Sequence, residues 1–150
     1  MAFDRELYEA EKRIYLEENK DLFIKTNPHP KELNVGDCVK RALVISTGMD
    51  YDELKIKINQ HKREMQKRKR KRPIRVFNDD RNWIPFMEKE FDVEKLQGYR
   101  NMKIGEFAKL ELPGSYIIRL RNHAVAVIDG KVLDTWNCSF NAIGRIWRVN

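Results

Sequence analysis

The sequence has few cysteines and no long apolar run, and both shortages narrow the classes of protein that it can encode. Only two of its 150 residues are cysteine, Cys38 and Cys138, too few for the disulfide framework of a small secreted domain. No apolar run approaches the roughly 20 residues that a membrane-spanning helix needs. The start, Met1 to Glu6, is charged where a signal peptide would be apolar. We therefore expect a cytoplasmic protein with reduced thiols and no membrane partner.

Two kinds of functional motif are also missing from the sequence. It has no glycine-rich phosphate-binding loop, so nothing supports nucleotide hydrolysis. It also lacks closely spaced metal ligands such as C-x-x-C. A zinc site would have to combine residues far apart in the chain, namely Cys38, His123, Asp134 and Cys138. We expect no metal and no cofactor, and we interpret Cys138 as an inert thiol.

Positive charge is concentrated in one segment of the chain. The sequence has 30 basic and 23 acidic residues, and residues 61–75 hold nine of the former and one of the latter, which leaves a charge of −1 on the rest. Such a run is typical of a mobile loop or a solvated helix end, and it also fits a contact with nucleic acid or an acidic protein. Its densest part is the basic patch Lys67, Arg68, Lys69, Arg70, Lys71 and Arg72.

The first half of the sequence has the apolar periodicity of helices. Residues 3–19 predict a surface helix whose apolar stripe packs on the core, formed by Phe3, Leu7, Ala10 and Ile14. A second helix is expected after the N-cap Asp37, and it should end at Thr47 and Gly48. Lys40 and Arg41 should mark its solvent side. The capping box of residues 50–53 begins a third helix.

The second half changes from an irregular pattern to a strand-like one. The irregular part contains Trp83, Phe86 and Phe91, which could line a groove or cover the core. Short helices are expected over 93–97 and 104–110. Strands are expected over 116–120, 124–128, 132–136 and 146–149. Helices followed by hairpin-linked strands predict an α+β fold, with one domain over 1–150 and an antiparallel sheet.

Cys38 is a candidate nucleophile because it follows a loop and begins the second predicted helix. The partial positive charge and free amides of a helix N-terminus favour a thiolate over a thiol. Among the histidines, His29 lies between prolines and His61 borders the basic run. His123 opens a strand of small and β-branched residues, where an imidazole can be held in one orientation. We therefore predict that His123 is the base.

The turn Asp129-Gly130 predicts the register of the last hairpin. If these two residues form the loop, residue 128 faces 131 and residue 125 faces 134. His123 and Asp134 then project from the same face as diagonal neighbours, close enough for a hydrogen bond. The predicted catalytic set is Cys38, His123 and Asp134, with the Cys38 amide and Asn34 as oxyanion donors.

These residues resemble the papain-like cysteine peptidase superfamily. The resemblance lies in Gly36-Asp37-Cys38 at a helix start, in His123 at a strand start and in Asp134-Thr135-Trp136 on the next strand. It implies a nucleophile on a central helix packed against an antiparallel sheet, and it implies that Trp136 shields the bond between Asp134 and His123. The stretch from residue 105 to residue 138 is also similar to small papain-like proteins of bacteriophages and prophages, which implies a bacterial or infected host cell.

The expected function is therefore hydrolysis of a peptide, isopeptide or related amide bond by a Cys-His-Asp triad. The family commonly has a glutamine upstream of the cysteine as an oxyanion donor, and none is present here. The alternative is a non-enzymatic phage or host-interaction protein that binds nucleic acid or an acidic partner through residues 61–75.

Overall fold

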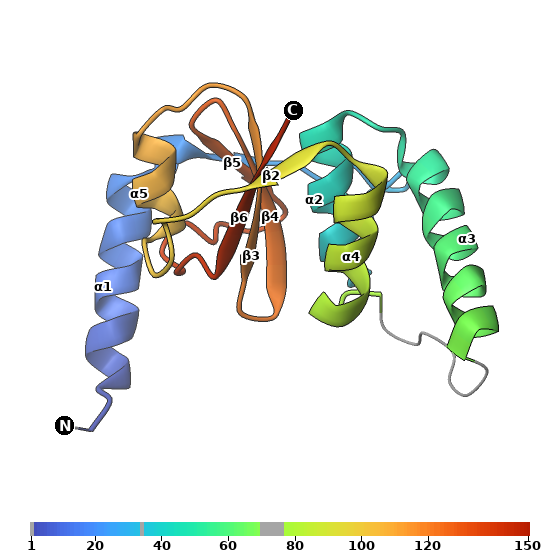
Figure 1. Ribbon diagram of the computed structural model, residues 1–150. Helices are drawn as coiled ribbons and strands as arrows, with labels where there is room; N and C mark the ends of the chain where they lie inside the picture. The colour runs from blue at the N-terminus through green and yellow to red at the C-terminus, as the bar shows by residue number, and fades with distance from the viewer. Residues whose placement is uncertain (1, 34, 70–76) are drawn as a thin grey trace.

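The computed structural model describes residues 2–33, 35–69 and 77–150, with helices and strands arranged in an α+β fold (Figure 1). Over these residues the chain forms five α-helices, a short 3-10 helix and a six-stranded mixed sheet. The helices are α1 (Arg5–Glu18), η1 (Lys20–Leu22), α2 (Cys38–Thr47), α3 (Tyr51–Lys69), α4 (Asp80–Glu90) and α5 (Ile104–Lys109). The strands are β1 (Phe23–Lys25), β2 (Val93–Lys95), β3 (Ser115–Leu120), β4 (His123–Ile128), β5 (Lys131–Asp134) and β6 (Arg145–Val149).

The sheet has the strand order β1-β5-β4-β3-β6-β2, and it is mixed rather than antiparallel as the sequence predicted. The central strands β5, β4, β3 and β6 are antiparallel neighbours, but β1 pairs in parallel with β5 at one edge. At the other edge β2 pairs with β6, so the helix expected over 93–97 is wrong. Both edge strands have three residues, too few to show strand periodicity in the sequence.

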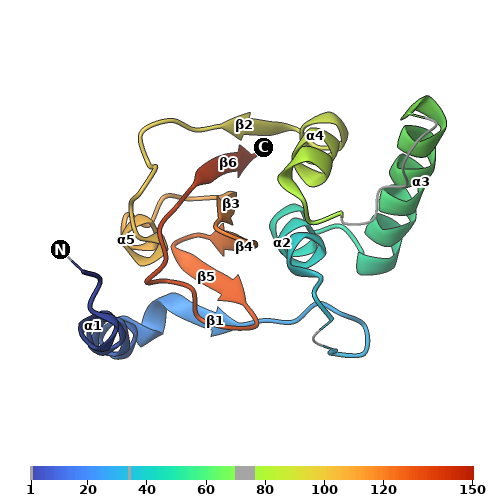
Figure 2. The same cartoon turned by 90° about the horizontal axis from the view of Figure 1, so that it is seen from below.

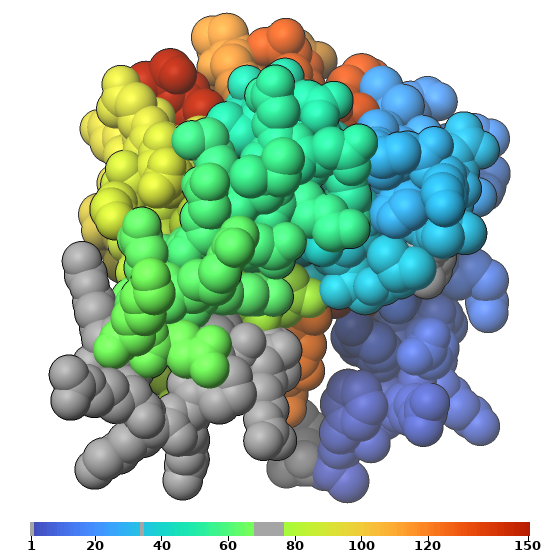
Figure 3. All heavy atoms as spheres, turned by 90° about the vertical axis from the view of Figure 1, so that its right-hand side faces the viewer, coloured from blue at the N-terminus to red at the C-terminus, as the bar shows by residue number. Residues whose placement is uncertain are grey.

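Helices cover both faces of the sheet (Figure 2). On one face α2 packs against β4 with α4 beside it, and α3 lies farther from the sheet, exposed on the side shown in Figure 3. The apolar core on this face includes Leu43, Leu54, Phe86, Ile117 and Trp147. On the other face α5 packs against the sheet, with α1 beside it. The sheet is thus held rigidly between two apolar layers, a suitable support for side chains that must keep a fixed geometry.

Helix α1 forms where the sequence predicts it, but its expected packing face is wrong. Phe3, Leu7 and Ile14 are 74%, 55% and 54% exposed. The helix packs instead through Tyr8 and Tyr15, whose rings contact Phe140, two residues after Cys138. The Tyr15 hydroxyl also donates a hydrogen bond of 2.5 Å to Glu106 on α5. Aromatic contacts and one polar contact therefore replace the aliphatic docking that the apolar spacing indicated.

Helix α4 occupies the segment that the sequence left irregular. Asp79 caps the helix by accepting a hydrogen bond from the amide of Arg81, although Pro85 lies inside it. An interior proline costs a helix about 3 kcal/mol, so burial of the neighbouring apolar side chains must offset this cost. Trp83 and Phe86 are 1% and 0% exposed, so both side chains belong to the core. Trp83 also reaches the wall of a cleft described below.

The basic segment is partly helical, since α3 continues to Lys69. Lys67 is exposed on this helix, whereas Arg70, Lys71 and Arg72 lie outside the described residues. Among the helices that are described, none combines the length and the apolar character that a bilayer crossing requires.

Candidate active site

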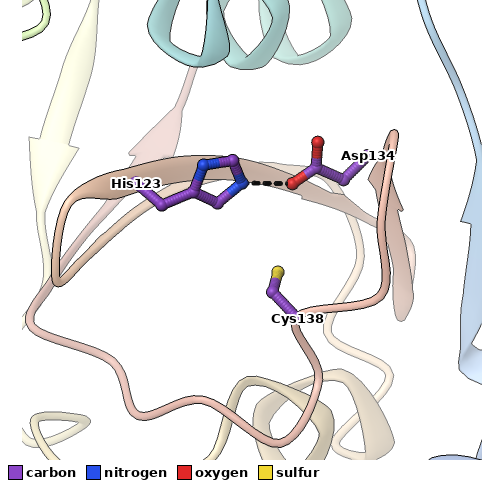
Figure 4. A group of neighbouring side chains, drawn as sticks. All are labelled: His123, Asp134 and Cys138. Atoms are coloured by element: carbon purple, nitrogen blue, oxygen red, sulfur yellow. Dashed lines mark hydrogen bonds and ion pairs between the residues drawn. The ribbon is translucent and has the colours of Figure 1, made fainter. Parts of the chain in front are cut away.

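The hairpin of β4 and β5 places His123 beside Asp134, as the sequence predicted. The register pairs Ile128 with Lys131 and Ala126 with Leu133, so the two-residue turn at Asp129-Gly130 is confirmed. Asp129 and Gly130 both have positive φ, of 47° and 79°, which such a turn requires. His123 Nε2 donates a hydrogen bond of 2.5 Å to Asp134 Oδ2 (Figure 4). The carboxylate fixes which ring nitrogen carries the proton and leaves the other free for a reacting group.

Cys38 is the second reactive side chain near His123. It is the first residue of α2, the helix that packs most extensively on β4, and its thiol is close enough to His123 to raise the pKa of the imidazole. Cys38 and His123 line one open cleft of about 640 Å³, whose other walls include Asn78, Asp80, Trp83 and Arg119. The structure thus brings Cys38, His123 and Asp134 together, with the thiol and the imidazole open to a ligand.

Opposing effects set the protonation of His123, whose side chain is only 9% exposed. Burial lowers its pKa, because an apolar environment disfavours the imidazolium. The hydrogen bonds to Asp134 and Cys38, together with the negative charges of these groups, outweigh burial and raise the pKa to about 9. His123 is therefore an imidazolium at neutral pH, poised to stabilise a thiolate on Cys38 and to release a proton to a leaving group.

Replacing Asp134 by asparagine should lower the pKa of His123 from about 9 toward or below its ordinary value of 6.5. The amide removes the negative charge that favours the imidazolium, while the burial that opposes it remains. A titration of the His123 ring resonances by NMR in the wild type and in Asp134→Asn measures the change. A pKa that stays near 9 in the variant would show that Asp134 does not set the charge state of His123.

A buried network that the sequence analysis missed holds Asp134 in place. Arg41 is 4% exposed, so its predicted position on the solvent side of α2 is wrong. Its guanidinium forms an ion pair with Asp37 one turn earlier and lies 3.5 Å from Asp134 Oδ1. The Tyr51 hydroxyl donates a hydrogen bond of 2.6 Å to the second oxygen of Asp37. The i,i+4 spacing of Asp37 and Arg41 was the available signal for this pair.

Trp136 lies beside His123 in the structure. Its ring centroid lies 4.8 Å from that of His123, so the indole covers one side of the imidazole. The indole is 41% exposed, which makes it one of the few large apolar side chains open to solvent. Shielding of the bond between His123 and Asp134 from water stays a prediction for this residue.

The oxyanion donors are the least defined part of the site. Asn34 lies outside the described residues. The backbone N–H of Cys38 has no acceptor among the described residues, as is usual in the first turn of a helix. Asn78, which sequence reasoning missed, donates its side-chain amide to the Gly36 carbonyl at 2.8 Å and so fixes the loop before the nucleophile. The amide of Cys38, in the first turn of α2, stays the predicted oxyanion donor.

Cys138 lies near His123 and Asp134 (Figure 4), and it does not line the cleft that Cys38 and His123 share. It is fully buried, and burial raises the pKa of its thiol, with the charge of Asp134 raising it further. Its sulfur, a nitrogen of His123 and an oxygen of Asp134 all lie within 4.8 Å of one another, the closest approach to a metal site in the described chain. Two ligands about 2.0 Å from a tetrahedral zinc ion would be roughly 3.3 Å apart. The 2.5 Å between His123 and Asp134 is instead a hydrogen-bond distance.

Ion pairs that the sequence analysis also missed form one wall of the cleft. Asp80 Oδ2 accepts from Arg119 Nε at 2.8 Å and Asp80 Oδ1 accepts from the Trp83 indole at 3.1 Å. Asp79 pairs with Arg81 at 3.0 Å near the surface. These residues come from α4 and β3, elements whose proximity no local sequence pattern indicates.

Comparisons of this chain with protein-family models, with curated proteins and with solved structures find no match in any of the three.

Proposed function

We propose that the protein is a papain-like thiol hydrolase that cleaves a peptide, isopeptide or related amide bond. The observation that carries this proposal is the position of His123, which is hydrogen bonded to Asp134 and lines the same cleft as Cys38 at the N-terminus of α2. Nucleophile, base and orienting carboxylate in this order form the arrangement that acyl transfer requires.

Each residue has a defined role in the proposed reaction. The Cys38 thiolate attacks the carbonyl carbon, and the resulting oxyanion is bound by the free amide of Cys38. The His123 imidazolium gives its proton to the amine as the carbon–nitrogen bond breaks, which leaves an acyl thioester on Cys38. Neutral His123 then takes a proton from water, the hydroxide attacks the thioester, and the proton returns to the departing sulfur as a carboxylic acid forms. Asp134 accepts a hydrogen bond from the ring throughout and holds its orientation.

Burial separates the two cysteines as candidate nucleophiles. Cys138 is fully buried and lines no part of the cleft. Its raised pKa keeps the side chain a thiol. Cys38 is half-buried and forms part of the cleft wall. Only Cys38 can therefore meet a carbonyl group from solvent.

Alkylation by iodoacetamide at about pH 6 tests the proposal, because an ordinary cysteine with a pKa of about 8.5 is less than about 1% thiolate there. We expect Cys38 to react at least about tenfold faster than N-acetylcysteine under the same conditions. The Cys138→Ser variant isolates this thiol, and Cys38→Ser is the matched control in which only Cys138 remains. Mass spectrometry of the modified peptides assigns the product.

A Cys38 that reacts no faster than N-acetylcysteine at about pH 6 would contradict the proposed nucleophile. So would predominant modification of Cys138 in the wild type. If Cys38 fails both tests and the protein binds nucleic acid, the results would favour the alternative function of residues 61–75.

A further inference from the structure

Two cationic pockets adjoin the candidate active-site cleft. The sheet-side pocket, of about 250 Å³, contains Lys95, Arg100, Arg119 and Arg145, and it shares the two last residues with the cleft. The helix-side pocket, of about 390 Å³, contains Lys40, Lys55 and Lys62, and it shares Asn78 with the cleft. Within the described parts of the chain, no aspartate or glutamate lines either pocket. The cleft is thus continuous with two separate regions of positive charge.

The geometry of the sheet-side pocket concentrates its charge next to the cleft. Arg119 on β3 and Arg145 on β6 are paired residues of neighbouring strands, so two positive charges lie side by side. Like charges at such positions destabilise a strand pair when no counter-ion is present. Asp80 neutralises Arg119, but Arg145 has no carboxylate within 4.0 Å among the described residues. A Cβ at Gly144 would lie 2.9 Å from Arg119 Nη1, so the absence of a side chain there lets the guanidinium lie across the strand.

The helix-side pocket has the same electrostatic character. Burial lowers the pKa of Lys40, Asp37 partly opposes this, and the charges of Lys55 and Lys62 lower the pKa further. The three ammonium groups therefore repel one another at the surface next to Gly36, two residues before the nucleophile. A bound anion would relieve this repulsion and the similar repulsion between the arginines.

We propose that the substrate of Cys38 is an acidic polypeptide whose carboxylates, outside the amide bond to be cleaved, enter these two pockets. The inference rests on the proposed hydrolase function. Because the pockets share walls with the cleft, one molecule whose carbonyl reaches Cys38 can place anionic groups in both of them. The substrates proposed above include polypeptides, whose side-chain anionic groups are carboxylates. Arginine binds it through paired N–H donors.

Binding can be measured without turnover in the Cys38→Ser variant. The probe is a short fluorescent peptide of alternating glutamate and alanine, and its matched control has lysine in place of glutamate. Fluorescence anisotropy should show binding of the glutamate peptide alone. Charge reversal by Arg145→Glu or Lys62→Glu, each in the Cys38→Ser background, should weaken binding about tenfold, since two opposed charges are exchanged for two like charges. Arg13→Glu on the exposed surface of α1 makes the same change in net charge and should have little effect.

Two results would overturn the inference while leaving the hydrolase proposal intact. The first is equal affinity for the glutamate and lysine peptides, and the second is an equal loss in Arg13→Glu and Arg145→Glu. Binding of a single-stranded DNA oligomer at these pockets, with no binding of the glutamate peptide, would likewise overturn it in favour of nucleic acid. Alkylation of the wild type by iodoacetamide separates the two proposals, because this small neutral reagent reports the reactivity of Cys38 without occupying either pocket. If Cys38 of the wild type reacts no faster than N-acetylcysteine, the hydrolase proposal and the inference are both overturned.

Discussion

Replacement of His123 by alanine is expected to slow alkylation of Cys38 by iodoacetamide at about pH 6 on the order of 10²-fold, within the range for removal of a positioned base. The reason is the imidazolium that the wild-type site maintains at this pH. His123 has a pKa of about 9, so it carries a positive charge beside Cys38 and favours its thiolate. Without it, the thiol must ionise next to a buried aspartate.

The pH dependence makes this prediction specific. As pH rises through about 9, His123 loses its proton and the attraction that favours the thiolate disappears. The wild-type and His123→Ala rates should therefore converge at about pH 10, where an ordinary cysteine is itself ionised. A difference that persists at this pH would indicate a steric or folding defect rather than loss of the charge.

His61→Gln provides the matched histidine control. His61 lies on α3, where its ring packs against Phe86, and it does not line the cleft. We expect His61→Gln to alkylate at the wild-type rate. Equal slowing of both variants would contradict the assignment of His123 as the partner of Cys38.

Replacement of Arg41 by methionine is expected to lower the free energy of unfolding by about 3–5 kcal/mol, the range for breaking a buried ion pair by removing one partner. The methionine chain fills a similar volume, so the cost comes from charge. Asp37 and Asp134 are both 2% exposed, and without Arg41 the first would lose its buried counter-charge while the second would keep only that of His123. Chemical denaturation followed by circular dichroism measures the change.

Arg148→Met is the matched control for Arg41→Met. Arg148 forms an ion pair of 2.6 Å with Glu94, but the two side chains are 48% and 54% exposed. An exposed pair contributes about 0–1 kcal/mol, so this variant should remain close to the wild type. Similar losses in both variants would show that Arg41 does not neutralise the buried carboxylates.

The cost of Arg41→Met should shrink when a carboxylate is removed as well. In Asp37→Asn/Arg41→Met the uncompensated charge of Asp37 is absent, so the double variant should be more stable than the sum of the single changes predicts. Simple additivity would mean that Asp37 and Arg41 do not interact in the folded protein. Arg41→Lys keeps the positive charge and should restore part of the lost stability, although it lacks the two-pronged geometry of arginine.

The sequence predicted the parts of the site that depend on local rules. The pair Asp129-Gly130 determines a two-residue turn, and the two-residue period of strands then brings His123 and Asp134 to one face. Gly48, with a φ of 75°, ends α2 as a left-handed cap for a reason that is equally local. Such features need only a few consecutive residues, and for this reason they can be read before the fold is known.

The errors concern contacts between distant segments. Arg41 was placed in solvent because arginine is rarely buried, and only the folded chain brings Asp134 close enough to accompany it. The stripe of Phe3, Leu7 and Ile14 has helical spacing, but Tyr8 and Tyr15 supply the packing because Phe140 lies on their side of α1. Residues 93–95 likewise form a strand and not the expected helix, because they pair with β6 at the edge of the sheet.

The most direct test of the proposed catalytic unit is the thiolate absorbance of Cys38 in the ultraviolet, recorded as the difference between the wild type and Cys38→Ser. At about pH 6 the account predicts a thiolate signal in the wild type, paired with the imidazolium of His123, and its loss in His123→Ala. The buried thiol of Cys138 is common to both proteins and cancels in the difference. A wild-type difference spectrum with no thiolate absorbance at this pH would contradict the charged pair of Cys38 and His123.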